Sequence, residues 1–372
     1  MEIKNERLIS LDVFRGITIA GMILVNNPGT WSAIYPPLKH AVWNGCTPTD
    51  YIYPFFLFIV GTAITLSLTK RKERGDNQTK LIVKIFRRTA LIFLLGLIQT
   101  GFPHFDLAAL RIPGVLQRIA VVYFVTSIIF LKTSIKTQAI IGVSLLFVYW
   151  AVMTLIPVPG IGYSNLEPTT NLAAYIDNLL LPGHLWSVTK VWDPEGFLST
   201  IPSVSTALAG VMLGHWLRSS NDKVTKTVWI FIFGNLGIVL GIIWDVWFPI
   251  NKSLWTSSYV LYTGGLALNF FAFCYWFVDV KGIKWWTKPF VVYGMNAIAV
   301  YMLASIFSGI LGLIKITGAV GKTLSLKRYL FENIFLPNFT ELNASLAWAV
   351  CYVLFWLGLM WILYSKKIFI KV

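Results

Sequence analysis

The 372-residue sequence is strongly apolar and basic: 56% of its residues are hydrophobic, 13% are charged, and the formal net charge is +15. Soluble domains carry about 25% charged residues, so this composition excludes an ordinary soluble globular protein. It also argues against a nucleic-acid-binding protein, because the positive charge is not gathered in a soluble basic domain.

Ten apolar segments along the chain are each long enough to cross about 30 Å of hydrocarbon. Helices are expected for all of them, because a helix satisfies its own backbone in lipid, whereas barrel strands would be shorter and alternate in polarity. The predicted spans are Leu8–Asn26, Tyr51–Leu68, Ile82–Gly101, Val115–Leu131, Gln138–Ile156, Phe197–Leu217, Thr227–Phe248, Ser258–Val278, Phe290–Ile314 and Ala344–Tyr364. We therefore predict an all-α polytopic membrane protein, with residues 1–372 as one transmembrane domain and no strands.

Basic residues are distributed unevenly between the predicted loops. With the N-terminus in the cytoplasm, about two-thirds of the 31 basic residues face the cytoplasm, including the run Lys70–Arg88. Both termini are therefore predicted to be cytoplasmic, with the basic loops lying against anionic lipid. Asp12 and Arg15 interrupt the start of the first span and no cleavage site follows it, so we expect this span to stay in the mature protein.

Two predicted outer loops are long, Pro157–Glu195 and Lys315–Asn343. They are candidates for a lid or an entry for a polar substrate, with simple connection of spans as the alternative. The apolar stretch Leu172–Leu181 predicts a short helix on the membrane surface. No metal site or disulfide framework is predicted, because the three cysteines are far apart and lack ligand spacing: Cys46, Cys274 and Cys351.

Polar residues gather where the first two predicted spans are joined, in the segments Asn26–Gly29 and His40–Gly45 and at Asp50. Polar groups beside spans are costly and usually functional. An imidazole exchanges a proton near neutral pH and needs an orienting partner, which Asn or Asp supplies. His40 is therefore a candidate catalytic residue, against the alternative of a loop histidine at the membrane interface.

Eight short blocks stand in a specific order along the chain. They are Leu11–Gly16, Val25–Asn26, Leu38–Gly45, Asp50 with Pro54–Phe58, Arg111–Arg118, Asp193–Gly196, Asn251–Val260 and Gly294–Ala297. In this order they resemble the heparan-alpha-glucosaminide N-acetyltransferase family and its bacterial members. The resemblance covers most of the chain, and the ordered set is specific although each block is weak.

The resemblance implies transfer of an acetyl group from cytoplasmic acetyl-CoA to the amino group of a terminal glucosamine across the membrane. It assigns the family's active-site histidine to His40 and its active-site asparagine to Asn26. It also implies a homodimer. We expect the chain to lack the N-terminal lumenal domain of the lysosomal member, and therefore expect ten spans rather than eleven, a bacterial inner-membrane location, and another amino sugar or glycan end as acceptor.

In the expected reaction, His40 acts as general base on the acceptor amine and Asn26 donates a hydrogen bond to the developing oxyanion. A route through an acetyl-histidine stays open. The candidate cofactor-binding residues, for the phosphates of acetyl-CoA, are Arg15 and Arg118, with buried ion pairs as the alternative. The candidate substrate-binding residues are Asn44, Asp50, Glu195 and Asp245.

Asp193 followed by Pro194 predicts the N-cap and first residue of a helix. Two other functions stay open. A secondary transporter or flippase for a sugar or lipid-linked glycan would also place polar groups within spans. An O-acetyltransferase acting on a cell-surface polysaccharide would share the donor and differ in the acceptor.

Overall fold

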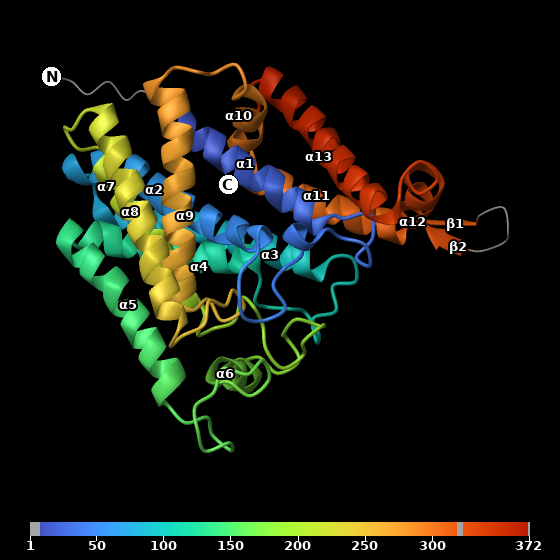
Figure 1. Cartoon of the computed structure of the whole chain (residues 1–372), viewed down its shortest axis with the longest axis horizontal. Coiled ribbons are helices and arrows are strands. Elements are labelled where there is room, and N and C mark those ends of the chain that lie inside the picture. The colour runs from blue at the N-terminus through green and yellow to red at the C-terminus, as the bar shows by residue number, and fades with distance from the viewer. Residues whose placement is uncertain (1–7, 318–322, 371–372) are drawn as a thin grey trace. The chain divides into compact units, whose positions relative to one another are not determined.

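The computed structural model describes residues 8–317 and 323–370, and within them the chain is almost entirely helical (Figure 1). The longer helices are α1 (Ile9–Asn26), α2 (Pro48–Glu73), α3 (Gln78–Gly101), α4 (Val115–Lys132), α5 (Ile135–Leu155), α7 (Thr200–Leu217), α8 (Lys223–Asp245), α9 (Ser257–Tyr275), α11 (Ala297–Leu313) and α13 (Glu341–Ser365). The shorter elements are η1 (Pro36–Leu38), α6 (Leu172–Leu180), η2 (Trp276–Val280), α10 (Lys288–Met295), α12 (Leu326–Leu330) and η3 (Phe331–Phe335).

Each predicted span falls on a helix, and the span Phe290–Ile314 falls on two, α10 and α11. Among the described residues, seven helices are long and apolar enough to cross a membrane: α1, α2, α4, α5, α8, α9 continued by η2, and α13. The pair α10–α11 makes an eighth candidate, although it bends by 82°. The all-α polytopic membrane fold is confirmed, whereas the count of ten and the cytoplasmic termini stay predictions, because α3 and α7 fall outside this group.

Chain contacts divide the described residues into two compact units. The first comprises residues 8–39, 221–232 and 268–370, and the second comprises 40–220 and 233–267. Neither unit is continuous in sequence, and α8 and α9 each contain residues of both. The expectation of a single transmembrane domain stays a prediction.

In the second unit, α2 and α7 pack at backbone distance. A Cβ on Gly61 would lie 1.8 Å from the Ala207 carbonyl oxygen, and one on Gly210 would lie 1.9 Å from the Phe58 oxygen. Because the two backbones are this close, the Thr62 hydroxyl can donate to the Gly210 carbonyl at 3.1 Å. Small residues and interhelical hydroxyl bonds are how membrane helices associate without a hydrophobic driving force between them.

In the first unit, α1 packs against α10 in the same way, with the Cβ position of Gly16 1.8 Å from the Phe290 carbonyl oxygen. The chain breaks between α10 and α11 at Asn296, which is 1% exposed. The Asn296 side chain donates to the Ile368 carbonyl at 3.3 Å and accepts from the Ile370 N–H at 2.8 Å. At this break, the Asn296 side chain therefore fixes the segment that follows α13.

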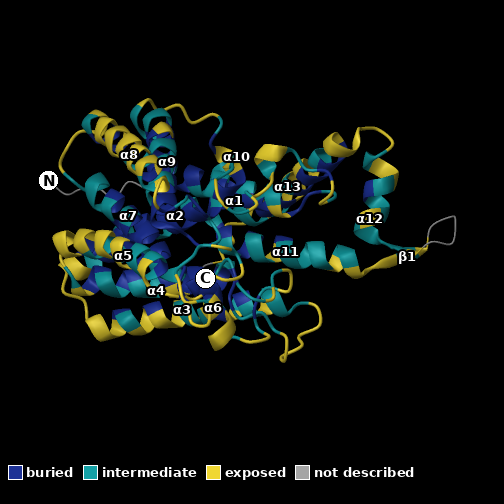
Figure 2. Cartoon of the chain, turned by 60° about the horizontal axis from the view of Figure 1, so that its bottom comes forward, coloured by how far each residue is buried: buried dark blue, intermediate teal, exposed yellow. Residues whose placement is uncertain are grey.

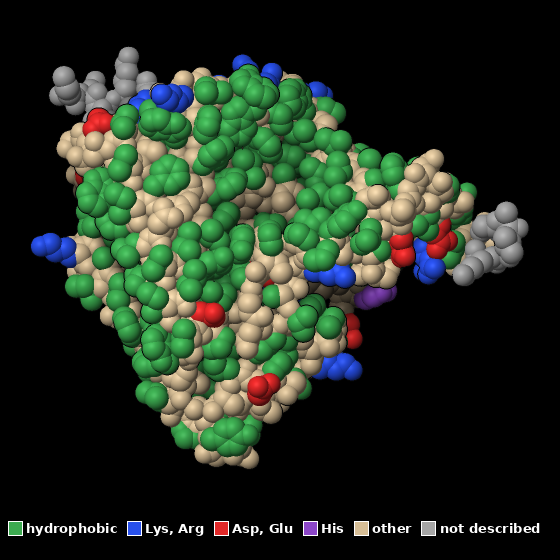
Figure 3. Space-filling model, in the orientation of Figure 1, with side chains coloured by type: hydrophobic (Ala, Val, Ile, Leu, Met, Phe, Trp, Pro, Cys, Tyr) green, Lys and Arg blue, Asp and Glu red, His purple; other side chains and the backbone are tan. Residues whose placement is uncertain are grey.

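Several candidate spans expose long apolar faces. Only 22% of the apolar windows of α5 and α8 is buried, against 67% for α2, and Figure 2 shows exposed residues along α5 and α8. Phe147, Leu236 and Ile243 are each about half exposed. Hydrophobic side chains also dominate the face drawn in Figure 3, with few charges among them. Patches of this extent suit contact with lipid rather than water.

Two expectations about the loops can be compared with the structure. A helix forms at α6, as the stretch Leu172–Leu181 predicts. The expectation of no strands is wrong at one place, where β1 (Lys315–Thr317) and β2 (Thr323–Ser325) pair antiparallel. Three residues on each side are too few for alternating polarity to show in the sequence.

Candidate functional site

The start of α2 is organised around the buried carboxylate of Asp50. Thr47 is the N-cap and Asp50 the third helical residue, and together they form a capping box with Pro48 as the first residue of the helix. Oδ2 of Asp50 accepts from the N–H groups of Thr47 and Ala41, both at 3.0 Å, and from the Thr47 hydroxyl at 3.1 Å. Asp50 therefore fastens the loop that carries His40 to the helix.

His40 is oriented by the other oxygen of the same carboxylate. Its Nδ1 lies 2.6 Å from Oδ1 of Asp50. Three donors on Oδ2 favour an ionised Asp50, so Oδ1 accepts and Nδ1 is the protonated ring nitrogen. The side chain of His40 is 46% exposed, against 1% for Asp50. The ring of His40 is therefore oriented through Nδ1, while Nε2 lies 3.4 Å from Nζ of Lys252.

Lys252 completes this group from the loop between α8 and α9. Its Nζ lies 3.5 Å from Oδ1 of Asp50 and 2.9 and 3.4 Å from the two ring nitrogens of His40. Burial lowers the pKa of Lys252, while the negative charge of Asp50 opposes that shift. The site thus contains an acid, a base and a cation within contact distance.

The segment Asn251–Lys252 is held against the loop that follows His40. Gly45 donates to the Ile250 carbonyl at 2.7 Å, and the Asn251 amide donates to Oδ1 of Asn44 at 3.2 Å. Asn251 also accepts from the Leu254 N–H at 2.9 Å and is fully buried. These bonds fix the position of Lys252 relative to His40.

A cavity of about 540 Å³ opens beside this strip of chain. It is lined by Asn44, Gly45, Cys46, Ile242, Asp245, Pro249, Ile250 and Tyr262. Two of the predicted substrate-binding residues, Asn44 and Asp245, therefore share one cavity. Asp245 accepts from the Ile250 N–H at 2.5 Å and is otherwise exposed. A carboxylate, an amide and a phenol on one wall suit a polyhydroxylated or amino-bearing ligand.

Cys46, one of the residues that line this cavity, carries a thiol. Burial raises the pKa of the Cys46 thiol, and the charge of Asp50 adds to the shift. A thiol in this environment stays protonated and unreactive.

Glu195 lies in a second polar cluster of the same unit. Arg111 donates to both oxygens of Asp193, at 2.8 and 2.6 Å, and to Oε2 of Glu195 at 2.6 Å. The N–H of Glu195 donates to Oδ1 of Asp193. The predicted N-cap role of Asp193 is wrong, because α7 begins later, at Thr200 with Ser199 as N-cap. Asp193 instead closes a turn and pairs with Arg111, which leaves Glu195 anchored at one oxygen.

Arg118 is 2% exposed and lies inside the second unit. One amino group, Nη2, donates to the Ser199 hydroxyl and, at 3.3 Å, to the Gly196 carbonyl, and the guanidinium lies 5.1 Å from the ring centroid of Trp255. Its recorded hydrogen bonds thus go to neutral oxygens rather than to Asp50 or Asp245. Nε and Nη1 are buried without a hydrogen-bond partner among the described residues.

The remaining two candidates belong to the first unit. Arg15 lies 3.2 Å from Asp12 and 3.5 Å from the Gly294 carbonyl, and its side chain is 23% exposed. Asn26 is the last residue of α1 and is exposed. Its partnership with His40 and the cofactor role of Arg15 stay predictions.

Two residues with central contacts, Lys252 and Arg111, carried no predicted role. Both are cations in predicted outer loops, where basic residues are scarce. Their isolation is a signal that could have found them. A single basic residue in a polar loop forms an ion pair with a carboxylate more often than one of many lysines in a basic loop does.

Comparison with known proteins decides the family. The sequence profile described as "Heparan-alpha-glucosaminide N-acetyltransferase, catalytic" matches residues 7–241, which is more than half of the chain. The chain belongs to this family. His40, Asp50 and Arg111 lie inside the matched region, and Lys252 lies beyond it.

Two curated family members resemble the chain over nearly its whole length. Heparan-alpha-glucosaminide N-acetyltransferase of Homo sapiens is 32% identical over 98% of this chain and 60% of its own length, and that of Mus musculus gives the same values. The chain thus spans about 60% of the length of these relatives. An uncharacterized 39.9 kDa protein of the amylase 3' region of Bacillus acidopullulyticus is 32% identical over 26% of this chain and 29% of its own.

Proposed function

We propose that this chain is a membrane N-acetyltransferase that moves an acetyl group from cytoplasmic acetyl-CoA to the amino group of a glucosamine-type sugar on the outer side. The observation that carries the proposal is the pair His40–Asp50, joined at 2.6 Å on a half-exposed histidine side chain, in a chain of this family. The family resemblance also suggests a homodimer and, for a bacterial-type member, an inner-membrane location.

The reaction follows from the chemistry of the pair. The acceptor amine attacks the thioester carbonyl, forming a C–N bond while the carbonyl π electrons move to oxygen. Nε2 of His40 takes the proton from the attacking nitrogen, and the protonated ring is stabilised by Asp50 through Nδ1. Collapse of the tetrahedral intermediate breaks the C–S bond, and the imidazolium returns the proton to the departing sulfur.

Other candidates take supporting parts in this proposal. Asn26 donates to the oxyanion. Arg15 favours the phosphates of acetyl-CoA by charge, whereas Arg118 is 2% exposed and is engaged by Ser199 and Gly196. Asn44 and Asp245 hold the sugar in the cavity of about 540 Å³, and Glu195 is available as a further acceptor contact. Lys252 is a positioning residue, because its ammonium pairs with the carboxylate that orients the ring.

The first test uses purified protein with radiolabelled acetyl-CoA and a panel of amino sugars, with products identified by mass. His40→Ala should lower kcat by roughly 10²–10⁴-fold, the usual contribution of a general base. His104→Ala is the matched control, because His104 is an exposed loop histidine. Wild-type turnover in His40→Ala would remove the proposed base, and labelled protein formed without acceptor would replace direct transfer by the acetyl-histidine route.

Lys252 is tested in the same assay. Lys252→Met removes the cation but keeps most of the volume, and should lower kcat about tenfold, which corresponds to loss of one charged contact. Lys252→Arg should recover part of the activity, since the charge returns with different geometry. Equal losses in both variants, with the pH profile unchanged, would make Lys252 a packing residue.

One observation favours the second function, a transporter or flippase for a sugar or lipid-linked glycan. The pair α10–α11 bends by 82° around a buried Asn296, and transporters build their sites at such broken helices. Protein reconstituted in liposomes would distinguish the two functions. Sugar uptake without acetyl-CoA, together with no acetylated product, would favour transport.

A further inference from the structure

The end of α13 contains a lysine in an unusual backbone conformation. The helix closes with two reverse hydrogen bonds, from Ile368 N–H to the Leu363 carbonyl at 2.9 Å and from Lys367 N–H to the Tyr364 carbonyl at 3.0 Å. This is the Schellman arrangement, whose left-handed residue is usually glycine. Here that residue is Lys367, with φ of 56°. A strained lysine where glycine would fit suggests that its side chain is needed.

The segment that follows is fixed rather than loose. Asn296, buried at the break between α10 and α11, binds the backbone of Ile368 and Ile370 through its amide. Lys367 and Phe369, which flank Ile368, are therefore held in place near Asn296, the residue at the C-terminal end of α10. Lys288 is the first residue of the same helix.

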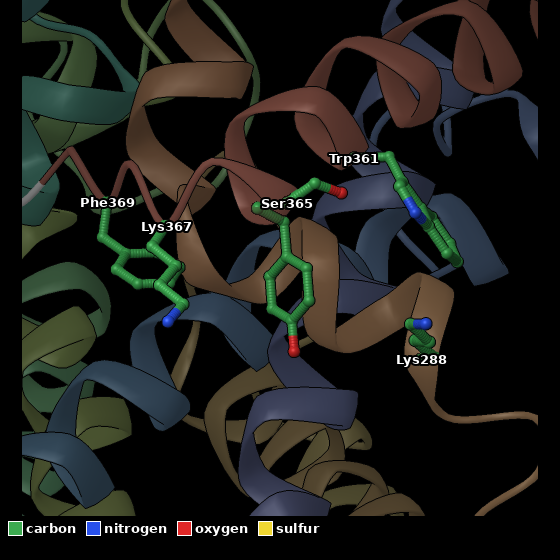
Figure 4. Close-up of a pocket in the computed structure, with 6 residues that line it drawn as sticks. Lys288, Trp361, Ser365, Lys367 and Phe369 are labelled. Carbon is green, nitrogen blue, oxygen red and sulfur yellow. The ribbon is translucent and has the colours of Figure 1, made fainter.

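Lys288 and Lys367 line the same cavity, which has a volume of about 390 Å³ (Figure 4). The other lining residues are Trp361, Tyr364, Ser365 and Phe369. Lys288 lies over Trp361, with Nζ 5.1 Å from the ring centroid. Among these six residues there are two ammonium groups and two hydroxyls but no carboxylate, so the cavity offers hydrogen-bond donors to an anion.

The cavity lies where candidate spans end. α13 ends at Ser365 and the bent pair α10–α11 begins at Lys288, so the two lysines stand at the ends of candidate spans. Apolar side chains next to them in the chain are well exposed: Ile362 at 53%, Ile368 at 45% and Ile370 at 43%. Charged donors beside exposed aliphatic surface match a ligand with an anionic head and hydrocarbon chains.

We propose that this cavity binds the phosphate group of an anionic membrane lipid. The shared chemistry is a phosphate held by Lys288 and Lys367, and a free phosphate would use the same donors. The exposed isoleucines distinguish the two sources, because acyl chains bury apolar surface that a soluble ion leaves in contact with water. Basic pockets between transmembrane helices are known to hold anionic head groups. The site is independent of the proposed acetyl transfer.

The experiment compares variants in nanodiscs made of phosphatidylcholine and phosphatidylglycerol in equal parts. Lipids that stay bound after release are identified by native mass spectrometry. The wild type should retain phosphatidylglycerol in preference to phosphatidylcholine. Lys288→Gln and Lys367→Gly should each reduce this preference about fivefold, the usual effect of one basic residue near the surface. Lys367→Gly is chosen because glycine favours the left-handed conformation, so the turn is kept while the charge is lost.

Lys366→Gln is the matched control, since Lys366 is adjacent and exposed but does not line the cavity. An equal loss in this control would overturn the site, because it would show general attraction to a basic surface. Inorganic phosphate is added in a separate arm. If phosphate raises the melting temperature of the wild type but not of Lys288→Gln, and phosphatidylglycerol is not selected, the lipid as the source is overturned.

Discussion

Asp50 uses the two oxygens of its carboxylate for two purposes. Oδ2 accepts the hydrogen bonds that cap α2, and Oδ1 faces His40 and Lys252. A buried carboxylate is costly unless every lone pair is used, and here protein groups supply those bonds. The ring of His40 is therefore oriented by the same group that starts a transmembrane helix.

The carboxyl of Asp177 should make the stability of the protein depend on pH. Burial raises its pKa to about 6, with the charge of Asp193 adding and the N–H donors of Phe197 and Asp193 opposing. A carboxyl whose pKa is higher in the folded than in the unfolded state stabilises the folded protein at pH values below the unfolded pKa. This contribution is lost as the pH rises through 6.

The melting temperature of the wild type should therefore fall relative to Asp177→Asn as the pH rises from 4 to 7. The difference in unfolding free energy is at most about 3 kcal/mol, since one pKa unit corresponds to 1.36 kcal/mol. Thermal unfolding in detergent across this pH range measures it. A difference that does not change with pH would contradict the buried, ionising Asp177.

The sequence predicts those site residues that lie close together along the chain and misses those that come from distant segments. His40 and Asp50 are ten residues apart in one polar segment, so their association is visible locally. Lys252 comes from a loop 212 positions away, and Arg111 meets Asp193 across 82 positions. No local pattern records such pairings, because they depend on how the helices pack.

Among the elements, the close contact of α2 and α7 depends on the absence of side chains at two glycines. Gly210→Ala would place a methyl group 1.9 Å from the Phe58 carbonyl oxygen, and neither backbone can move without disturbing the hydroxyl bonds between the helices. We expect a loss of about 1–3 kcal/mol, the range for overpacked cores, seen as a lower melting temperature in detergent.

Gly358→Ala in α13 is the matched control, because nothing lies within 4 Å of the added methyl group. It should be neutral or stabilising, since alanine is favoured over glycine within a helix by about 1 kcal/mol. Comparable losses in the two variants would remove the argument for a special contact between α2 and α7.

Helix positions were predicted well because hydropathy alone identifies long apolar segments. The break between α10 and α11 was not predicted, because Phe290–Ile314 is apolar on both sides of Asn296. A single amide in such a segment does not predict a bend of 82°. The Asn296 side chain binds the segment after α13. The bend depends on partners that only tertiary structure supplies.

For the whole molecule, the orientation predicted from basic residues has a direct test. A green fluorescent protein fused after Val372 should fluoresce, and alkaline phosphatase fused there should be inactive, because the C-terminus is predicted to be cytoplasmic. Fusions after Gly162, in the first long outer loop, should give the opposite pair of results. Active phosphatase at the C-terminus would reverse the predicted topology and with it the side from which acetyl-CoA is expected to enter.

The bonds to Asp50 have a consequence for the exchange of amide hydrogens with deuterated solvent. Ala41 and Thr47 lie in a loop with many exposed residues, yet both of their N–H groups donate to a carboxylate that is 1% exposed. Their amides should exchange as slowly as those of a helix interior while their neighbours exchange freely. Simultaneous loss of this protection at both amides would report release of the loop from Oδ2 of Asp50, and so would measure how often this loop opens without any substrate.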